Sequence, residues 1–170
     1  MAVLFLMVGF PGAGKTTTSR LIAKLTGAVH IWADHERRKM FGEPTHSLPE
    51  SKALYAHLNN LAAELLGQGK SVIFDTNFNF RRDRDHLRAI AHAAGAETHI
   101  IWIQVDKSLA LDRAQHEDHA TDNHYTETMQ RSDFDRMTSH LQAPTADEQP
   151  IILDGTRITA SYLSEKLGLS

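Results

Sequence analysis

The chain has no cysteine, few aromatic residues and no marked excess of charge of either sign. Without cysteine there is neither a disulfide framework nor a thiolate nucleophile, and a reducing compartment such as the cytoplasm is favoured. Aromatic residues make up 7% of the 170 residues, and no RNP-like aromatic motif indicates stacking of nucleic-acid bases. The formal net charge of −3 is unlike that of a non-specific nucleic-acid binder, so such a role would require a local basic patch.

Long hydrophobic runs are missing as well. The apolar run at residues 2–8 is too short to cross a membrane, and no basic segment precedes it as in a signal peptide. We therefore expect this run to form a buried strand. With 41% hydrophobic and 23% charged residues, the composition is typical of a globular protein, and residues 1–170 are expected to form one domain around one core.

Short apolar runs alternate with helix-like segments along the chain. Strands are expected at residues 3–8, 28–33, 72–74, 100–105 and 151–153. Helices are expected at residues 15–25, 34–41, 50–66, 82–94, 108–115, 127–141 and 161–167. This alternation predicts an α/β fold in which a parallel sheet is covered by helices on right-handed crossovers.

A glycine-rich segment after the first expected strand matches the G-x-x-x-x-G-K-[ST] pattern without a mismatch. Glycines let backbone N–H groups curl around phosphates, and the N-terminus of the following helix points at the anion. Lys15 is expected to reach the β- and γ-phosphates of ATP, and the Thr16 hydroxyl to bind Mg²⁺. The residues expected to hold the nucleotide are Gly9, Pro11, Gly12, Ala13, Gly14, Lys15, Thr16 and Thr17.

The absence of other motifs narrows the class of P-loop protein. No Asn-Lys-x-Asp segment that would read guanine occurs. The third expected strand leads into Asp75, a candidate ligand of Mg²⁺, but Thr76 and Asn77 follow it instead of the Glu with which a motor ATPase activates water. The remaining class of P-loop protein is a small kinase, which transfers the γ-phosphate of ATP to a hydroxyl group.

Asp34 follows the second expected strand. The carboxyl ends of parallel strands line the ligand crevice, so a carboxylate there can accept the proton of an attacking hydroxyl group. Asp is also a good N-cap for the helix expected at residues 34–41. The residue pattern by itself supports both roles.

Three segments resemble the kinase domain of the phage-type 5′-hydroxyl polynucleotide kinase. They are Gly9–Thr17, Ile31–Arg37 and Asp75-Thr76-Asn77, and the resemblance extends from about residue 3 to 141. The same segments are similar to wider relatives of that enzyme: small P-loop kinases, zeta-toxin kinases and chloramphenicol phosphotransferase.

The resemblance implies a three-layer P-loop fold with five parallel strands and the phosphate-loop strand in the middle. It implies that Asp34 is the general base, that Arg37 holds the acceptor and that Thr76 lies beside the acceptor. The acceptor-binding set expected on these grounds is Asp34, Arg37, Thr76, Asn77 and Arg84.

Small kinases close a lid over the phosphates, and lid arginines neutralise charge in the transition state. The lid is expected at about residues 113–130. The family's lid carries an Arg, three residues and a second Arg; Arg113 matches the first as a catalytic residue, but Glu117 takes the second place. Either Arg131 or Arg136 substitutes for it, or catalysis is weak.

The same segment is rich in histidine and acidic residues. Such side chains could hold zinc, or they could be the solvated groups of a polar lid, which is the interpretation we favour. The residues are His116, Glu117, Asp118, His119, Asp122 and His124.

Two basic clusters follow the second and third expected strands, at residues 37–39 and 81–88. They indicate an anionic acceptor such as a polynucleotide 5′-end, a nucleotide or a sugar phosphate, unless they are solvated helix faces paired with Asp83 and Asp85. A toxin-type kinase of nucleotide sugars, or an ATP-binding regulatory protein with weak hydrolysis, is the alternative function.

Overall fold

The computed structural model describes residues 1–116 and 129–169, whose strands form one parallel sheet. The strands are β1 (Val3–Val8), β2 (Val29–Trp32), β3 (Val72–Asp75), β4 (Glu97–Gln104) and β5 (Ile151–Asp154). Their order in the sheet is β2-β3-β1-β4-β5. The strand that precedes the phosphate loop is therefore central, and the predicted five-stranded α/β sheet is confirmed.

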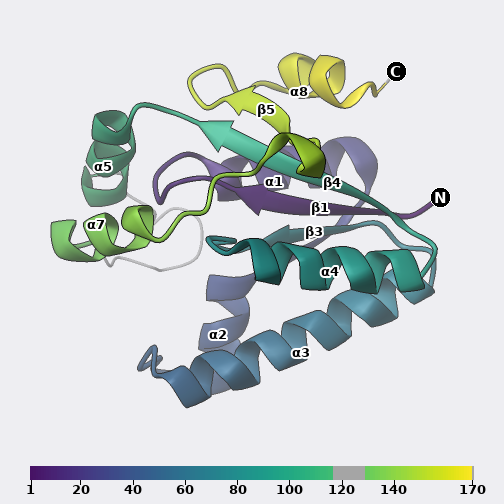
Figure 1. The fold of residues 1–170 in the computed structure, drawn as a ribbon, viewed down its shortest axis with the longest axis horizontal. Helices are drawn as coiled ribbons and strands as arrows, with labels where there is room; N and C mark the ends of the chain where they lie inside the picture. Colours follow the sequence, from purple (N-terminus) through teal and green to yellow (C-terminus); the bar gives the residue numbers. More distant parts are fainter. Residues whose placement is uncertain (117–128, 170) are drawn as a thin grey trace.

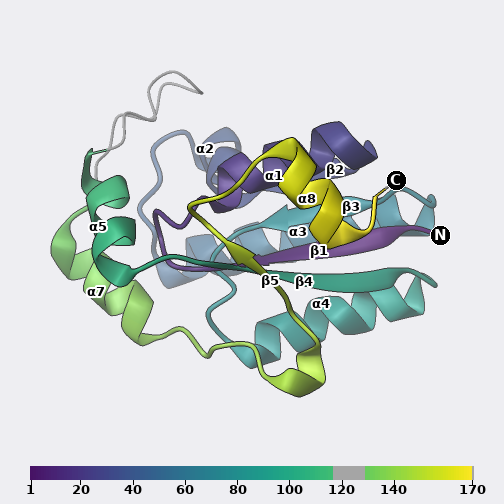
Figure 2. The same cartoon turned by 90° about the horizontal axis from the view of Figure 1, so that it is seen from above.

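Helices cover both faces of the sheet, and two further helices lie beyond the carboxyl ends of the strands. They are α1 (Lys15–Thr26), α2 (Ala33–Phe41), α3 (Leu48–Gly67), α4 (Arg81–Ala93), α5 (Lys107–His116), α7 (Arg131–Ser139) and α8 (Ala160–Leu167), with a short 3₁₀ helix, η1, at Ala146–Glu148. In Figure 1, α1 and α8 lie on one face and α3 and α4 on the other, while α5 and α7 stand beyond the tips of the strand arrows. Figure 2 shows the same layers from above. None of the helices in the described ranges is long and apolar enough to span a bilayer.

The side chains of β1 explain why its sequence is apolar without interruption. Leu4, Leu6 and Val8 belong to the core under α3 and α4, while Phe5 and Met7 belong to the core under α1 and α8. All five are at most 5% exposed. A central strand with both faces covered buries successive residues on opposite sides, so alternation between polar and apolar residues is lost.

Two element boundaries differ from the expectation in ways that matter for the site. Helix α2 begins at Ala33 with Trp32 in the N-cap position and no side-chain capping bond, so the prediction that Asp34 is the N-cap is wrong. Asp34 lies instead in the first helical turn. The helix expected at residues 127–141 is found as α7, and residues 127–128 of that expectation lie outside the described chain.

Candidate functional site

The phosphate loop joins β1 to α1 and takes a conformation that requires glycine. Gly12 has φ +80°, and a Cβ there would lie 2.1 Å from the carbonyl oxygen of Ala110 in α5. Gly14, directly before α1, has φ +104°. These backbone angles turn successive N–H groups toward one side, as an anion-binding loop at a helix N-terminus needs.

Lys15 is the cation of this loop. Its Nζ donates to the carbonyl oxygens of Gly9 and Phe10, at 2.9 Å each. Burial lowers the pKa of Lys15 to about 8, although the carboxylates of Asp75 and Asp34 oppose the shift. Both carboxylates act on the same ammonium group, so the loop, the end of β3 and the start of α2 converge on one site.

Asp75 ends β3 on the buried side of this site. The side chain is 3% exposed, and its Oδ2 accepts a hydrogen bond from His30 Nε2 on β2 at 2.9 Å. His30 was not predicted, because no sequence motif links it to a residue 45 positions away. The carboxylate of Asp75 and the hydroxyl of Thr16 are the oxygen donors that Mg²⁺ prefers. The donor set therefore fits this ion.

Asp34 stands at the open mouth of the same site. Its side chain reaches solvent. Desolvation by the surrounding protein and repulsion from Asp75 nevertheless raise the pKa of Asp34, against the attraction of Lys15, Arg37 and His46. A carboxylate with a raised pKa holds a proton more readily than an ordinary one, which suits a general base.

Arg37 lies one turn after Asp34, but it is buried and paired. Nη1 donates to Glu50 Oε1 at 2.7 Å, and Nη2 donates to Ser51 Oγ at 3.2 Å. Glu50 also accepts hydrogen bonds from Thr45 and from the His46 backbone. Desolvation alone would raise the pKa of Glu50, but these hydrogen bonds outweigh it and lower the pKa to about 2. The pair fixes α2 against α3, and sequence reasoning missed Glu50.

Thr76, at the end of β3, has a partner that was also missed. The hydroxyl of Tyr55 on α3 lies 2.6 Å from Thr76 Oγ1. Burial raises the pKa of the Tyr55 phenol, and both Asp34 and Arg37 act on it electrostatically. Tyr55 therefore lies at the same site as Asp34 and Arg37. Asn77 follows with an exposed side chain.

Arg84 is placed differently from what the sequence indicated. It is fully buried in α4, where Nε and Nη2 donate to the two carboxylate oxygens of Glu148 in η1. Nη1 donates to the carbonyl oxygens of Phe78 and Gln142. A side chain enclosed and bonded in this way joins α4 to η1, and its predicted contact with the acceptor has no support in this placement.

The other arginines of α4 have acidic neighbours. Arg81 pairs with Asp85 and Asp147, and Arg88 pairs with Asp85. The basic cluster at residues 81–88 is thus largely balanced, as the interpretation of a paired helix face predicts.

The described part of the predicted lid consists of the end of α5 and residues 129–130. Arg113 donates to the carbonyl oxygen of Gly155, after β5, at 3.3 Å. On α7, Arg131 pairs with Asp135 and Arg136 with Asp133. Glu117, His119 and His124 lie outside the described residues. Within residues 1–116 and 129–169, no cluster of three or more His, Asp or Glu side chains is placed to hold a metal ion.

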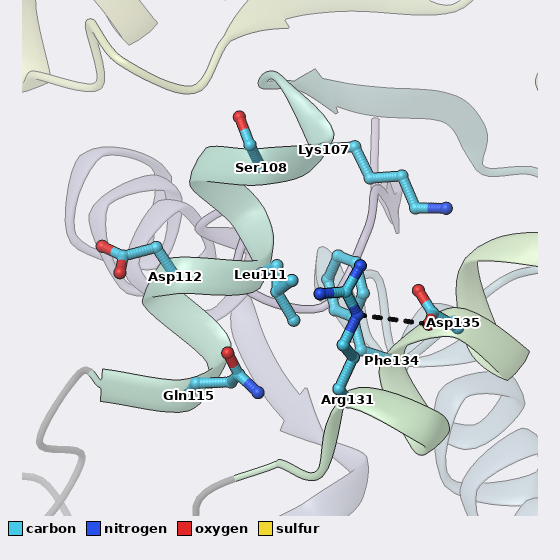
Figure 3. Close-up of a pocket in the computed structure, with 8 residues that line it drawn as sticks. All are labelled: Lys107, Ser108, Leu111, Asp112, Gln115, Arg131, Phe134 and Asp135. Carbon is cyan, nitrogen blue, oxygen red and sulfur yellow. Dashed lines mark ion pairs between the residues drawn. The ribbon is translucent and has the colours of Figure 1, made fainter.

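A separate hollow of about 460 Å³ lies between α5 and α7 (Figure 3). Leu111 and Phe134 contribute its apolar lining, and Lys107, Asp112 and the Arg131–Asp135 pair give it a polar rim. The ring of Phe134 packs 6.5 Å from that of Phe10 in the phosphate loop. The hollow therefore adjoins the loop from the side of α5 and α7.

The fold and the loop define a P-loop nucleotide-binding protein of the three-layer α/β class. The chain belongs to the AAA domain family AAA_33, whose model matches residues 4–144. An uncharacterized protein of Mycobacterium tuberculosis is 33% identical over 121 residues, which is 64% of this chain and 24% of that protein. An uncharacterized protein of Mycobacterium bovis matches equally well. The chain thus spans about a quarter of the length of these curated relatives.

Solved structures share the fold at low sequence identity. Kti12 of Chaetomium thermophilum, in complex with ADP-AlF₃, has a TM-score of 0.72 and 21% identity over 98% of this chain and 96% of that one. The APS kinase of Mycobacterium tuberculosis, in complex with AMPPNP and APS, has a TM-score of 0.66 and 16% sequence identity, and the match covers 98% of both chains. A gluconokinase of Sinorhizobium meliloti has a TM-score of 0.65 and 18% sequence identity, and the match covers 98% of this chain and 89% of that one. The fold is that of small kinases, while the particular likeness to phage polynucleotide kinase stays a prediction.

Proposed function

We propose that this protein is a kinase that transfers the γ-phosphate of ATP to a hydroxyl group of its acceptor. The observation that carries the proposal is that Lys15, Asp75 and Asp34 lie at the carboxyl ends of three neighbouring parallel strands, β1, β3 and β2, where both carboxylates act on the Lys15 ammonium group. One cation for the phosphates, one buried carboxylate and one accessible carboxylate are the set that phosphoryl transfer to a hydroxyl uses.

In the proposed reaction, the acceptor oxygen forms a bond to the γ-phosphorus while the bond from that phosphorus to the bridging oxygen of ADP breaks. Asp34 takes the proton of the acceptor hydroxyl. Lys15 and the backbone N–H groups of the loop bind the phosphate oxygens, and Arg113 is proposed to approach them from α5. Thr16 and Asp75 would hold Mg²⁺, which screens the phosphate charge when bound.

The second question is whether the acceptor of the phosphate is an anion. An anionic acceptor was expected from the two basic clusters, and Arg37, Arg81 and Arg84 in those clusters are paired with carboxylates. These ion pairs weaken the argument that the acceptor is an anion. They do not affect the argument that the phosphate is transferred to a hydroxyl group. Location in the cytoplasm stays a prediction.

The test is ADP release from ATP and Mg²⁺ measured with a panel of hydroxyl compounds, including sugars, nucleosides and 5′-hydroxyl oligonucleotides. Release that depends on one class of acceptor supports the kinase. Slow ATP loss that no acceptor accelerates would contradict it and support the alternative, an ATP-binding regulatory protein. Transfer to a nucleotide sugar alone would support a toxin-type kinase.

A further inference from the structure

Three hydroxyl groups, of Ser51, Tyr55 and Thr76, lie near Arg37 and the end of β3, where the acceptor is proposed to bind. Tyr55 and Ser51 lie four residues apart on α3 and so share a helix face. Ser51 Oγ contacts Arg37, and the Tyr55 hydroxyl contacts Thr76 Oγ1. Hydroxyl groups both donate and accept, so this set can exchange hydrogen bonds with the hydroxyls of a ligand.

The only sequence-predicted cation of the acceptor set that lies beside these hydroxyls is Arg37. Its partner Glu50 keeps its negative charge well into acid solution, because four donors hold the carboxylate. Arg37 is 8% exposed and Glu50 is equally buried. An acceptor phosphate arriving at Arg37 would therefore meet an ion pair.

The carboxylate at the mouth adds to this effect. Asp34 is exposed beside the hydroxyl set, and Asp75 lies behind it. An anionic acceptor would have to approach the Asp34 carboxylate as well as the γ-phosphate of ATP. Like charges brought together in a partly desolvated crevice repel one another strongly, whereas an uncharged ligand avoids that repulsion.

We infer that the acceptor is a small uncharged compound with several hydroxyl groups, such as a sugar or polyol, and that the Tyr55 hydroxyl contributes to its binding. The inference rests on the proposed kinase function. The Tyr55 and Thr76 hydroxyls would bind acceptor hydroxyls that do not react. The reacting hydroxyl would then lie toward Asp34.

The test compares matched acceptors that differ by one phosphate: ribose and ribose 5-phosphate, glucose and glucose 1-phosphate, adenosine and adenosine 3′-phosphate. The expected result is a kcat/KM at least about tenfold higher for the uncharged member of the preferred pair. The same pairs are measured by melting with Mg²⁺ and a non-hydrolysable ATP analogue, which needs no turnover. A preference for the phosphorylated member, or no response to any uncharged member in either assay, overturns the inference.

Variants separate specificity from a structural role. Tyr55→Phe keeps the ring and removes the hydroxyl, so it should raise the acceptor KM about tenfold and leave the KM for ATP unchanged. Tyr162→Phe is the matched control, because it also removes one hydrogen-bonded tyrosine hydroxyl, but at a place away from the proposed acceptor site. The Tyr162 hydroxyl, on α8, accepts a hydrogen bond from the backbone N–H of Asp154. Unchanged acceptor KM in a folded Tyr55→Phe protein contradicts the role of Tyr55.

A second variant tests the charge argument. Glu50→Gln removes the charge that balances Arg37, so it should shift the kcat/KM ratio about tenfold toward the phosphorylated member of each pair. A preference of the unmodified protein for the phosphorylated member of each pair would overturn this inference and leave the proposed kinase intact. ATP loss that ignores every acceptor would instead contradict the proposed function itself.

Discussion

At the scale of single residues, Lys15 should be needed for ATP use and not for folding. Its ammonium group bonds two carbonyl oxygens of its own loop and lies at the ligand-facing end of the sheet. Lys15→Ala should lower kcat/KM for ATP by roughly 10²–10³-fold, the usual effect of removing one group that stabilises transferred charge. Lys24→Ala, at the exposed end of the same helix, is the control. ATP turnover that survives in folded Lys15→Ala would refute the nucleotide site.

Asp34 should control the pH dependence of transfer. The base must be ionised, and its pKa is raised, so activity should fall on acidification at a higher pH than an ordinary carboxylate would give. Asp34→Asn should lower kcat by roughly 10²–10⁴-fold and keep ATP affinity. Residual activity of the Asn variant should lack the acid limb, which a pH–rate profile of both proteins measures. Full activity in Asp34→Asn would remove the candidate base.

The same substitution should not destabilise the protein. Between the ordinary pKa of Asp and the raised pKa in the fold, the folded state binds more protons than the unfolded state, so stability falls as pH rises through that window. At neutral pH the ionised Asp34 is therefore unfavourable to folding, and Asn relieves this. Asp34→Asn should melt no lower than the unmodified protein at pH 7, and the difference should vanish below the ordinary pKa. A lower melting temperature at pH 7 would contradict this.

At the scale of elements, the contact between α4 and η1 depends on the Arg84–Glu148 pair. Both side chains are fully buried, so removal of one leaves an uncompensated charge. Arg84→Ala should lower the free energy of unfolding by about 3–5 kcal/mol in urea titrations, whereas Arg84→Met with Glu148→Leu should lose less. The exposed Arg88→Ala is the control, with an expected change of at most about 0.5 kcal/mol. Equal losses from Arg84→Ala and Arg88→Ala would show that the buried pair adds nothing.

The elements show which features of the molecule can be predicted from sequence. The phosphate loop, its flanking strand and helix, and the alternation of elements are encoded in contiguous residues, and the structure has them within a few residues of the expected bounds. The two faces of β1 were likewise evident from its unbroken apolar run.

The contacts that shape the site were not predictable in this way. The His30–Asp75, Arg37–Glu50 and Tyr55–Thr76 contacts join residues 45, 13 and 21 positions apart, and no local pattern encodes such pairing. Arg84 shows the same limit, because its position on a basic helix gave no sign that Glu148, 64 residues later, encloses it. A run of basic residues in the sequence shows where cations are, but it does not show which of them form ion pairs with distant carboxylates.

At the scale of the whole molecule, binding of the nucleotide should stabilise the fold. A ligand that binds only the folded state at about 100 times its Kd adds about 2.7 kcal/mol. For a chain of this size the melting temperature should rise by roughly 5–10 °C with Mg²⁺ and a non-hydrolysable ATP analogue. Chelation of Mg²⁺, and the Lys15→Ala variant, should each remove most of the rise. An unchanged melting temperature at saturating analogue would contradict ATP binding.

The division of the crevice between stretches of chain bears on how such proteins diversify. The phosphate loop, residues 9–16, follows the central strand β1, whereas Asp34, Arg37, Glu50, Tyr55 and Thr76 all lie between residues 34 and 76, beside the β2–β3 half of the sheet. In the proposed function, acceptor choice is therefore carried by one continuous segment, residues 34–76, beside the β2–β3 half of the sheet. Substitutions within this segment would then change the acceptor and leave the residues that bind phosphate unchanged.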